Sequence, residues 1–220
     1  MVQRYGSAAR PSWRFRPSIS DRDRPGMSGR LLDPATRPSD GRRGDSWWML
    51  ADCEERVPPQ LRPWLAEPGL LTARVRAACG PGTRLRLLGL EPASLDPDLQ
   101  LRMGVADRGC LLRDVEIGCH EARWVFARSV FPDSTVSQHP WLRELGDTGL
   151  GEYLAQVGEV RRETLEYREL RPGHALFTAA ARGADLAGPL WARRAVYRLV
   201  DAPILVQEVF LPALAPAVGQ

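Results

Sequence analysis

Residues 110–131, CLLRDVEIGCHEARWVFARSVF, decide the fold of this chain. Two segments rich in β-branched and aromatic residues flank the polar linker 119–122, and this pattern is typical of a β-hairpin. A second hairpin is predicted at 191–211, where WARRAVYRLV and ILVQEVFL flank Asp201-Ala202-Pro203. Strands joined by hairpins form antiparallel sheets, so we expect one sheet built around these two hairpins.

The segments around the hairpins alternate between strand and helix patterns. Further strands are predicted at 83–90, 99–105 and 164–170. Helices are predicted at 58–67, 70–79, 141–146, 150–157 and 177–186, with Thr72 as a candidate N-cap and Gly80-Pro81 as a stop signal. This mixture favours an α+β fold in which helices flank an antiparallel sheet.

The two ends of the chain differ in composition from its middle. Residues 1–46 carry ten arginines, five aspartates and no glutamate, a net charge of +5, and have few apolar residues. Such a segment cannot bury enough apolar surface to fold, so we expect a disordered extension at 1–46, a folded domain at 47–212 and a short tail at 213–220. A transit peptide, or a start at Met27 or Met49, are alternative interpretations of the extension. The remainder has a net charge of −2, so we do not expect the folded domain to bind nucleic acid.

Several classes of protein are excluded by composition. The four cysteines, Cys53, Cys79, Cys110 and Cys119, form no C-x-x-C motif and lack paired histidines, which argues against a metal site. No signal peptide is recognisable, so we expect a cytoplasmic protein with free thiols. No apolar run reaches the roughly 18 residues of a membrane span. The sequence contains no lysine, which excludes catalysis through a lysine Schiff base.

Two charged residues fall on apolar strand faces. Side chains alternate between the faces of a strand, so Arg113 shares its face with Leu111 and Val115, and Glu208 shares its face with Val206 and Phe210. A buried charge needs a partner. Either Arg113 and Glu208 pair with each other, or they face a ligand, in which case Glu208 is suited to proton transfer and Arg113 to binding an anion.

Other polar residues carry weaker signals. Arg128 and Arg194 lie on predicted strands and are expected to form buried structural salt bridges. His120, His139 and His174 lie in predicted turns or beside proline or glycine, and are expected at the surface.

A series of segments in order resembles the chorismate–pyruvate lyase family. The segments are LRDV (112–115), WVFARSV (124–130), LGEYL (150–154), WARR (191–194) and LVQEVFLP (205–212), preceded by Trp64-Leu65 and Leu71-Thr72. The resemblance covers residues 47–212. It departs at Leu71, at Gly149, at Ala192 and Ala195, and in the long loop 171–189.

The resemblance implies a single domain with an antiparallel sheet of about six strands and helical flaps over a buried site. It implies a cytoplasmic monomer that converts chorismate to 4-hydroxybenzoate and pyruvate without a cofactor or metal, for ubiquinone synthesis. Leu71, Arg113, Leu150 and Glu208 match the substrate-binding positions, with Arg113 and Glu208 as the catalytic pair. The alternative is a non-catalytic small-molecule-binding domain of the same fold, as in effector domains of bacterial transcription regulators.

Overall fold

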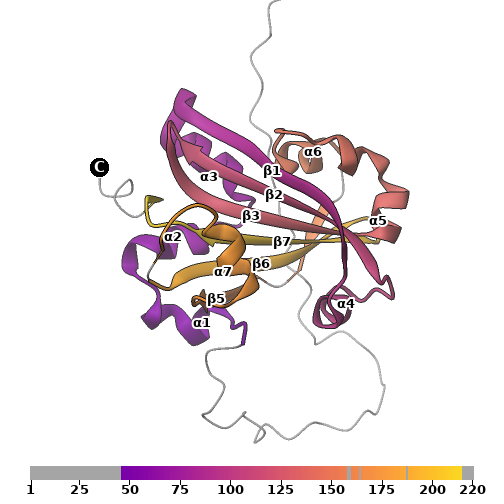
Figure 1. The fold of residues 1–220 in the computed structure, drawn as a ribbon, viewed down its shortest axis with the longest axis horizontal. Helices are drawn as coiled ribbons and strands as arrows, with labels where there is room; N and C mark the ends of the chain where they lie inside the picture. Colours follow the sequence, from indigo (N-terminus) through magenta and orange to yellow (C-terminus); the bar gives the residue numbers. More distant parts are fainter. Residues whose placement is uncertain (1–45, 158–159, 164, 187, 215–220) are drawn as a thin grey trace, which may run out of the picture.

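A single antiparallel sheet organises the chain. The computed structural model describes residues 46–157, 160–163, 165–186 and 188–214. Seven strands pair in the order β1-β2-β3-β7-β6-β4, and β5 pairs with β6 beside β4 (Figure 1). The strands are β1 (Thr83–Ser94), β2 (Gly109–Cys119), β3 (Ala122–Pro132), β4 (Val160–Arg162), β5 (Glu166–Leu170), β6 (Leu190–Leu199) and β7 (Ala202–Phe210). The predicted antiparallel α+β fold is confirmed, and both predicted hairpins form, as β2–β3 and β6–β7.

Helices cover both faces of this sheet. We call the face that carries Arg113 and Glu208 the first face, and the face that carries Arg128 and Gln207 the second face. Apolar residues of α3 and α6 pack on the first face, and those of α4 and α7 pack on the second. In Figure 1, α7 lies in front of the sheet and α3 behind it. The helices are α1 (Leu50–Cys53), η1 (Glu54–Arg56), η2 (Pro59–Leu61), α2 (Arg62–Leu65), α3 (Leu71–Cys79), η3 (Gly80–Gly82), α4 (Pro97–Met103), α5 (Asp133–Gln138), η4 (Pro140–Glu144), α6 (Leu150–Val157) and α7 (Ala175–Ala180).

The predicted strand at 99–105 is wrong, because this segment belongs to helix α4. The side chain of Asp96 caps the helix by accepting a hydrogen bond of 2.8 Å from the backbone N–H of Asp98, and Pro97 occupies the first turn. Gly104 ends the helix in the left-handed conformation, with φ of 67°. Alternating Leu99, Leu101 and Met103 imitate a strand in the sequence, but Leu101 is exposed and Met103 is buried as helical periodicity requires.

Two helix starts also differ from prediction. Thr72 does not cap α3, because the N-cap position is Leu70 and Thr72 lies buried in the first turn. Helix α7 begins at Ala175 rather than at residue 177, because the ring Nδ1 of His174 accepts a hydrogen bond from the backbone N–H of Leu176. The predicted stop at Gly80 is confirmed, since its φ of 64° suits glycine.

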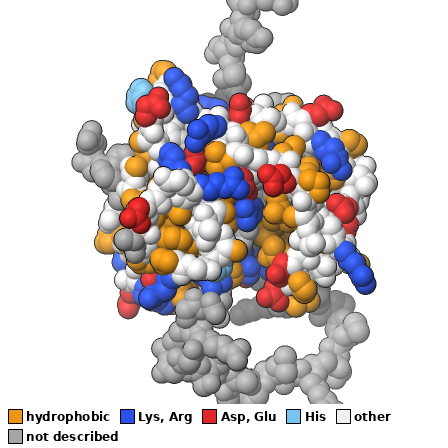
Figure 2. Space-filling view, viewed as in Figure 1, with side chains coloured by type: hydrophobic (Ala, Val, Ile, Leu, Met, Phe, Trp, Pro, Cys, Tyr) orange, Lys and Arg blue, Asp and Glu red, His pale blue; other side chains and the backbone are white. Residues whose placement is uncertain are grey.

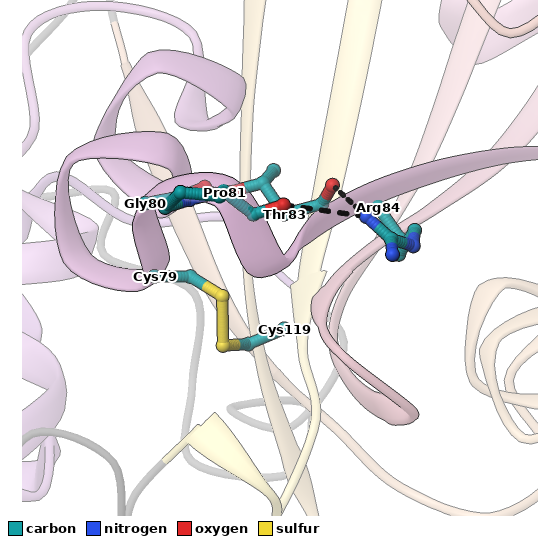
Figure 3. The surroundings of a disulfide bond; sticks show 6 residues. All are labelled: Cys79, Gly80, Pro81, Thr83, Arg84 and Cys119. Carbon is teal, nitrogen blue, oxygen red and sulfur yellow. Dashed lines mark hydrogen bonds between the residues drawn. A yellow bond between two sulfur atoms is a disulfide. The ribbon is translucent and has the colours of Figure 1, made fainter.

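The expectation of four free thiols is wrong for one pair of cysteines. Cys79 and Cys119 form a disulfide with Cα atoms 5.6 Å apart, which joins the end of α3 to the end of β2 (Figure 3). The pairing of β1 with β2 places Thr83 opposite Cys119, so the end of α3 arrives beside that strand. Cys53 and Cys110 are free and buried, as expected.

The predicted boundaries of the folded domain can be compared with the described residues only in part. The expected disordered extension lies outside them except for Ser46, and the expected tail lies outside them beyond Leu214, which is buried in the core. No helix within the described ranges is long and apolar enough to cross a membrane.

The disulfide closes a loop with a sequence separation of 40 residues. Its contribution to the free energy of unfolding can be measured. We expect C79S/C119S to lower the free energy of unfolding by about 2–4 kcal/mol, because the unfolded chain regains the entropy of an open loop. Urea denaturation measures the change, and a thiol assay of the unfolded wild type should detect only Cys53 and Cys110. Equal stability of the variant and the wild type would contradict a formed disulfide.

Candidate active site

Four residues matched by the family resemblance meet on the first face of the sheet. Arg113 on β2 lies opposite Ser129 of β3, and Glu208 on β7 lies opposite Ala127 of β3. Strand spacing and rise therefore separate the Cα atoms of Arg113 and Glu208 by about 12 Å, which two long side chains can span together with a small ligand. Arg113 is 2% and Glu208 4% exposed.

Glu208 is paired with Arg193, not with Arg113. Arg193 lies beside Glu208 in the register of β6 and β7, and its Nε donates a hydrogen bond of 2.6 Å to Oε2 of Glu208. The other carboxylate oxygen, Oε1, accepts a hydrogen bond of 3.0 Å from the backbone N–H of Leu71. Burial is the largest influence on the pKa of Arg193 and lowers it, but Glu208, Tyr197 and Tyr167 together outweigh burial and the net shift is upward.

Arg193 also holds the segment that leads into α3. Its two terminal nitrogens donate hydrogen bonds to backbone carbonyls in the segment from α2 to α3, the shortest being 2.6 Å to Glu67 and 2.7 Å to Gly69. The side chain is fully buried. These carbonyls follow helix α2 and lack helical partners, so the guanidinium satisfies groups that would otherwise be buried without hydrogen bonds.

Sequence reasoning missed Arg193, although a signal was present. In β6, Arg193 alternates with Trp191, Ala195 and Tyr197, so the face test that selected Arg113 would have selected Arg193 too. The adjacent Arg194, which was predicted to form a salt bridge, lies on the opposite face.

Arg113 has a different environment. Its Nη2 donates hydrogen bonds of 2.8 Å to the carbonyl of Gly146 and 2.7 Å to that of Thr148. Among the described residues no carboxylate forms an ion pair with it, and its Nε is buried without a hydrogen-bond partner. Burial lowers the pKa of Arg113 to about 10, and the nearby Asp147 offsets only part of this effect. An unmatched buried donor of this kind is a natural contact for a bound anion.

Leu71 and Leu150 begin the two helices that close over this face. Both residues are buried, and both helices begin beside each other. A side chain placed at Gly149 would lie 3.2 Å from Thr72, and one placed at Gly151 would lie 3.2 Å from Leu70. An ion pair between Arg76 of α3 and Glu152 of α6 links the helices on their outer side. We call α3 and α6 the two flaps.

The expected structural salt bridges are confirmed on the second face. Arg128 binds both carboxylate oxygens of Asp114 at 2.8 Å, and Nε of Arg194 binds Glu166 at 2.8 Å.

One group of potential metal ligands occurs within the described ranges, formed by Cys79, Cys119 and His120. The two sulfur atoms are bonded to each other there, so they cannot act as thiolate ligands.

The fold resembles that of PhnF proteins with solved structures. PhnF from Mycobacterium smegmatis superimposes with a TM-score of 0.51 at 18% identity, covering 67% of this chain and 65% of that chain. A structure of the PhnF C-terminal domain gives a TM-score of 0.50 at 12% identity, covering 66% of this chain and 89% of that chain. At such identities the likeness defines the fold class alone: a single-domain, antiparallel α+β fold.

Sequence comparisons define the family more closely. Residues 44–218 match the family described as chorismate lyase. A probable chorismate pyruvate-lyase of Methylococcus capsulatus is 38% identical over 161 residues, which are 69% of this chain and 94% of that protein. One from Thiobacillus denitrificans is 40% identical over 164 residues, which are 72% of this chain and 86% of that protein. The chain therefore belongs to the chorismate lyase family.

The buried pair can be tested through stability. We expect R193M to lower the free energy of unfolding by about 3–5 kcal/mol, because it leaves the carboxylate of Glu208 buried without its cation. The double variant R193M/E208M should recover part of this loss, since no charge is then stranded. Urea denaturation measures both.

The matched control for R193M is R86M. The Arg86 side chain is 68% exposed and pairs with Glu116, which keeps Arg123 as a second partner. Its loss should cost at most about 1 kcal/mol. Similar losses of unfolding free energy in R193M and R86M would show that the buried pair of Arg193 contributes no more than an exposed one.

Proposed function

We propose that this protein is a chorismate–pyruvate lyase that forms 4-hydroxybenzoate and pyruvate, as the first committed step of ubiquinone synthesis. The observation that carries the proposal is the environment of Arg113, whose buried guanidinium has an unmatched donor and no carboxylate partner in the described part of the chain. It lies on the same face as Glu208 and donates hydrogen bonds to the carbonyls of Gly146 and Thr148, directly before flap α6. Membership of the chorismate lyase family supports the same reaction.

The reaction requires little from the protein beyond binding and one proton transfer. In chorismate the bond between the ring carbon and the ether oxygen breaks, so the oxygen leaves with the enolpyruvyl group, and the hydroxyl-bearing ring carbon loses its proton. The enolpyruvyl group keeps the electron pair of the broken bond and gains a proton on its methylene carbon, which yields pyruvate. The ring becomes aromatic, which supplies the driving force. We therefore propose that no cofactor or metal takes part.

The two charged residues have separate proposed roles. Arg113 binds an anionic oxygen of the substrate through its unmatched donors, because a guanidinium recognises carboxylates by paired hydrogen bonds. Glu208 contacts the ring hydroxyl and accepts, or positions the acceptor of, the transferred proton. Arg193 and the N–H of Leu71 fix the carboxylate of Glu208 in place. Leu71 and Leu150 close the flaps and exclude water, which strengthens these contacts.

Incubation with chorismate tests the reaction directly. We expect equal amounts of 4-hydroxybenzoate and pyruvate, measured by chromatography and by a coupled lactate dehydrogenase assay. Binding of 4-hydroxybenzoate without turnover would instead favour the non-catalytic binding domain. Absence of both binding and turnover would contradict the proposal.

The variants R113M and E208Q separate binding from proton transfer. We expect R113M to raise KM and weaken binding of 4-hydroxybenzoate, because it removes the contact to an anion. E208Q should lower kcat by about 100-fold or more, because proton transfer occurs in the transition state. The controls are R86M and E91Q, which change exposed residues of β1. Unchanged kinetics in R113M and E208Q would contradict the assigned roles.

Independence from metals gives a further prediction. Activity should survive prolonged EDTA treatment followed by desalting, since the proposed steps use only side chains of the protein. A loss that zinc or magnesium restores would show a metal requirement.

We also propose that residues 1–46 are dispensable. A chain that begins at Trp47 retains the stacking of Trp47 on Arg194 and the backbone pairing of Trp48 with Tyr167. We expect the melting temperature and kcat of this shortened chain to equal those of the full chain. A decrease of several degrees in melting temperature would show that the removed residues stabilise the domain.

The proposed setting is a monomer in the cytoplasm. Large exposed apolar residues are few in the described ranges, namely Met49, Leu101 and Val200, which favours a monomer in size-exclusion chromatography. Because disulfides are rare in the reducing cytosol, the bond between Cys79 and Cys119 should form only in the purified, oxidised protein, and both thiols should be alkylated when cells are lysed directly into a thiol-blocking reagent. A fully oxidised pair in such lysates would contradict the cytoplasmic setting.

A further inference from the structure

A cavity of about 830 Å³ opens on the second face of the sheet, between helices α4 and α7. Such a volume is within the usual range of small-molecule sites. The sheet separates it from the candidate active site, because Arg113 and Glu208 point to the opposite face. Figure 2 looks onto this face and shows arginine side chains beside apolar ones around a central hollow. The proposed lyase reaction makes no use of this cavity.

A row of polar residues crosses the sheet beneath the cavity. The strand register places one residue from each of five adjacent strands in line, in the order Asp114, Arg128, Gln207, Arg194 and Glu166. The outer carboxylates bind the two arginines, and the central three residues line the cavity. The result is two cations with an amide between them at the floor of a pocket.

The hydrogen-bonding capacity of this floor is only partly used. Gln207 is 8% exposed, and within the described residues its side-chain amide has no hydrogen-bond partner. Arg194 uses Nε for Glu166, and its two terminal nitrogens have no partner in the same part of the chain. Burial lowers the pKa of Arg194, and pairing with Glu166 does not fully offset this effect. A ligand oxygen in the cavity could accept hydrogen bonds from these donors, which lie at its floor without a partner among the described residues.

Part of the remaining wall is apolar, and Arg102, Arg168 and His174 add polar side chains to it. Cys110, Leu112 and Val130 line the cavity from the sheet, and Leu95, Leu99 and Leu176 line it from the α4 and α7 sides. Trp47 stacks on the guanidinium of Arg194, with 4.4 Å between the ring centre and Cζ. Two exposed carboxylates, Asp96 and Asp98, also line the cavity and would repel a second negative charge. The floor therefore suits an anionic group beside Arg194 and Gln207, and the apolar wall suits an apolar body attached to it.

We propose that this cavity is a second ligand site, which binds a monocarboxylate with an apolar body through Arg194 and Gln207. The carboxylate accepts hydrogen bonds from the terminal nitrogens of Arg194 and from the amide of Gln207. The apolar body lies along Leu112 and Val130. Aromatic acids and fatty acids share this chemistry.

Fluorescence titration of the full chain with 8-anilinonaphthalene-1-sulfonate, an anion with an aromatic body, tests the site. We expect R194Q to weaken binding about tenfold or more, since it removes a charge-assisted contact. R194Q is expected to fold because Glu166 keeps Nε of Arg102 as a partner at 3.0 Å. Q207L changes the amide alone, preserves side-chain size and should weaken binding several-fold, so it carries the test if R194Q fails to fold.

Two control variants show whether a loss of probe binding is specific to the cavity. R143Q changes an exposed arginine of η4, and R113M changes the first face. Both should bind the probe as the wild type does. Equal binding by R194Q, Q207L and the wild type would overturn the proposal, and so would a loss confined to R113M.

Competition identifies the class of ligand. We expect 1-naphthoate or dodecanoate to displace the probe, and the stronger competitor distinguishes an aromatic acid from a fatty acid. The neutral analogues 1-naphthalenemethanol and 1-dodecanol should compete at least tenfold less well. Equal competition by acids and alcohols would show that the pocket does not recognise a carboxylate.

Discussion

The ion pair between Glu208 and Arg193 is the interaction on which the candidate active site depends. Glu208 binds the N–H of Leu71 with its other oxygen, and Arg193 binds the carbonyls before α3 with its other nitrogens. One buried pair therefore connects two central strands to the start of a flap. A buried charge without its partner is strongly destabilising, so the position of this flap and the charge of the site are fixed together.

The two flaps are attached to the sheet by the same physical device. Arg193 satisfies backbone carbonyls at the base of α3, and Arg113 satisfies the carbonyls of Gly146 and Thr148 at the base of α6. Of these two arginines, only Arg193 has a carboxylate partner among the described residues. This difference separates a guanidinium with a structural role from one whose charge is available to a substrate.

The two faces of the sheet use polar residues differently. On the first face, charged side chains are enclosed by the flaps and bind backbone groups of those flaps. On the second face, Arg128 and Arg194 bind carboxylates within the sheet itself, and the amide of Gln207 between them faces an open cavity. Alternation of side chains lets adjacent residues such as Gln207 and Glu208 belong to unrelated sites.

The sequence alone determined an antiparallel sheet, both hairpins, and the position of Arg113 and Glu208 on apolar faces of their own strands, because strand periodicity and turn signals act over a few residues. It did not determine which residues these charges contact. The partner of Glu208 is 15 residues away in the chain, Leu71 is 137 residues away, and the disulfide spans 40. Helix α4 was mistaken for a strand because its apolar residues alternate with polar ones as in a strand. Only the packing of Leu99 and Met103 on the second face identifies the segment as a helix. Contacts of this kind depend on the register and order of the strands, which only the tertiary structure decided.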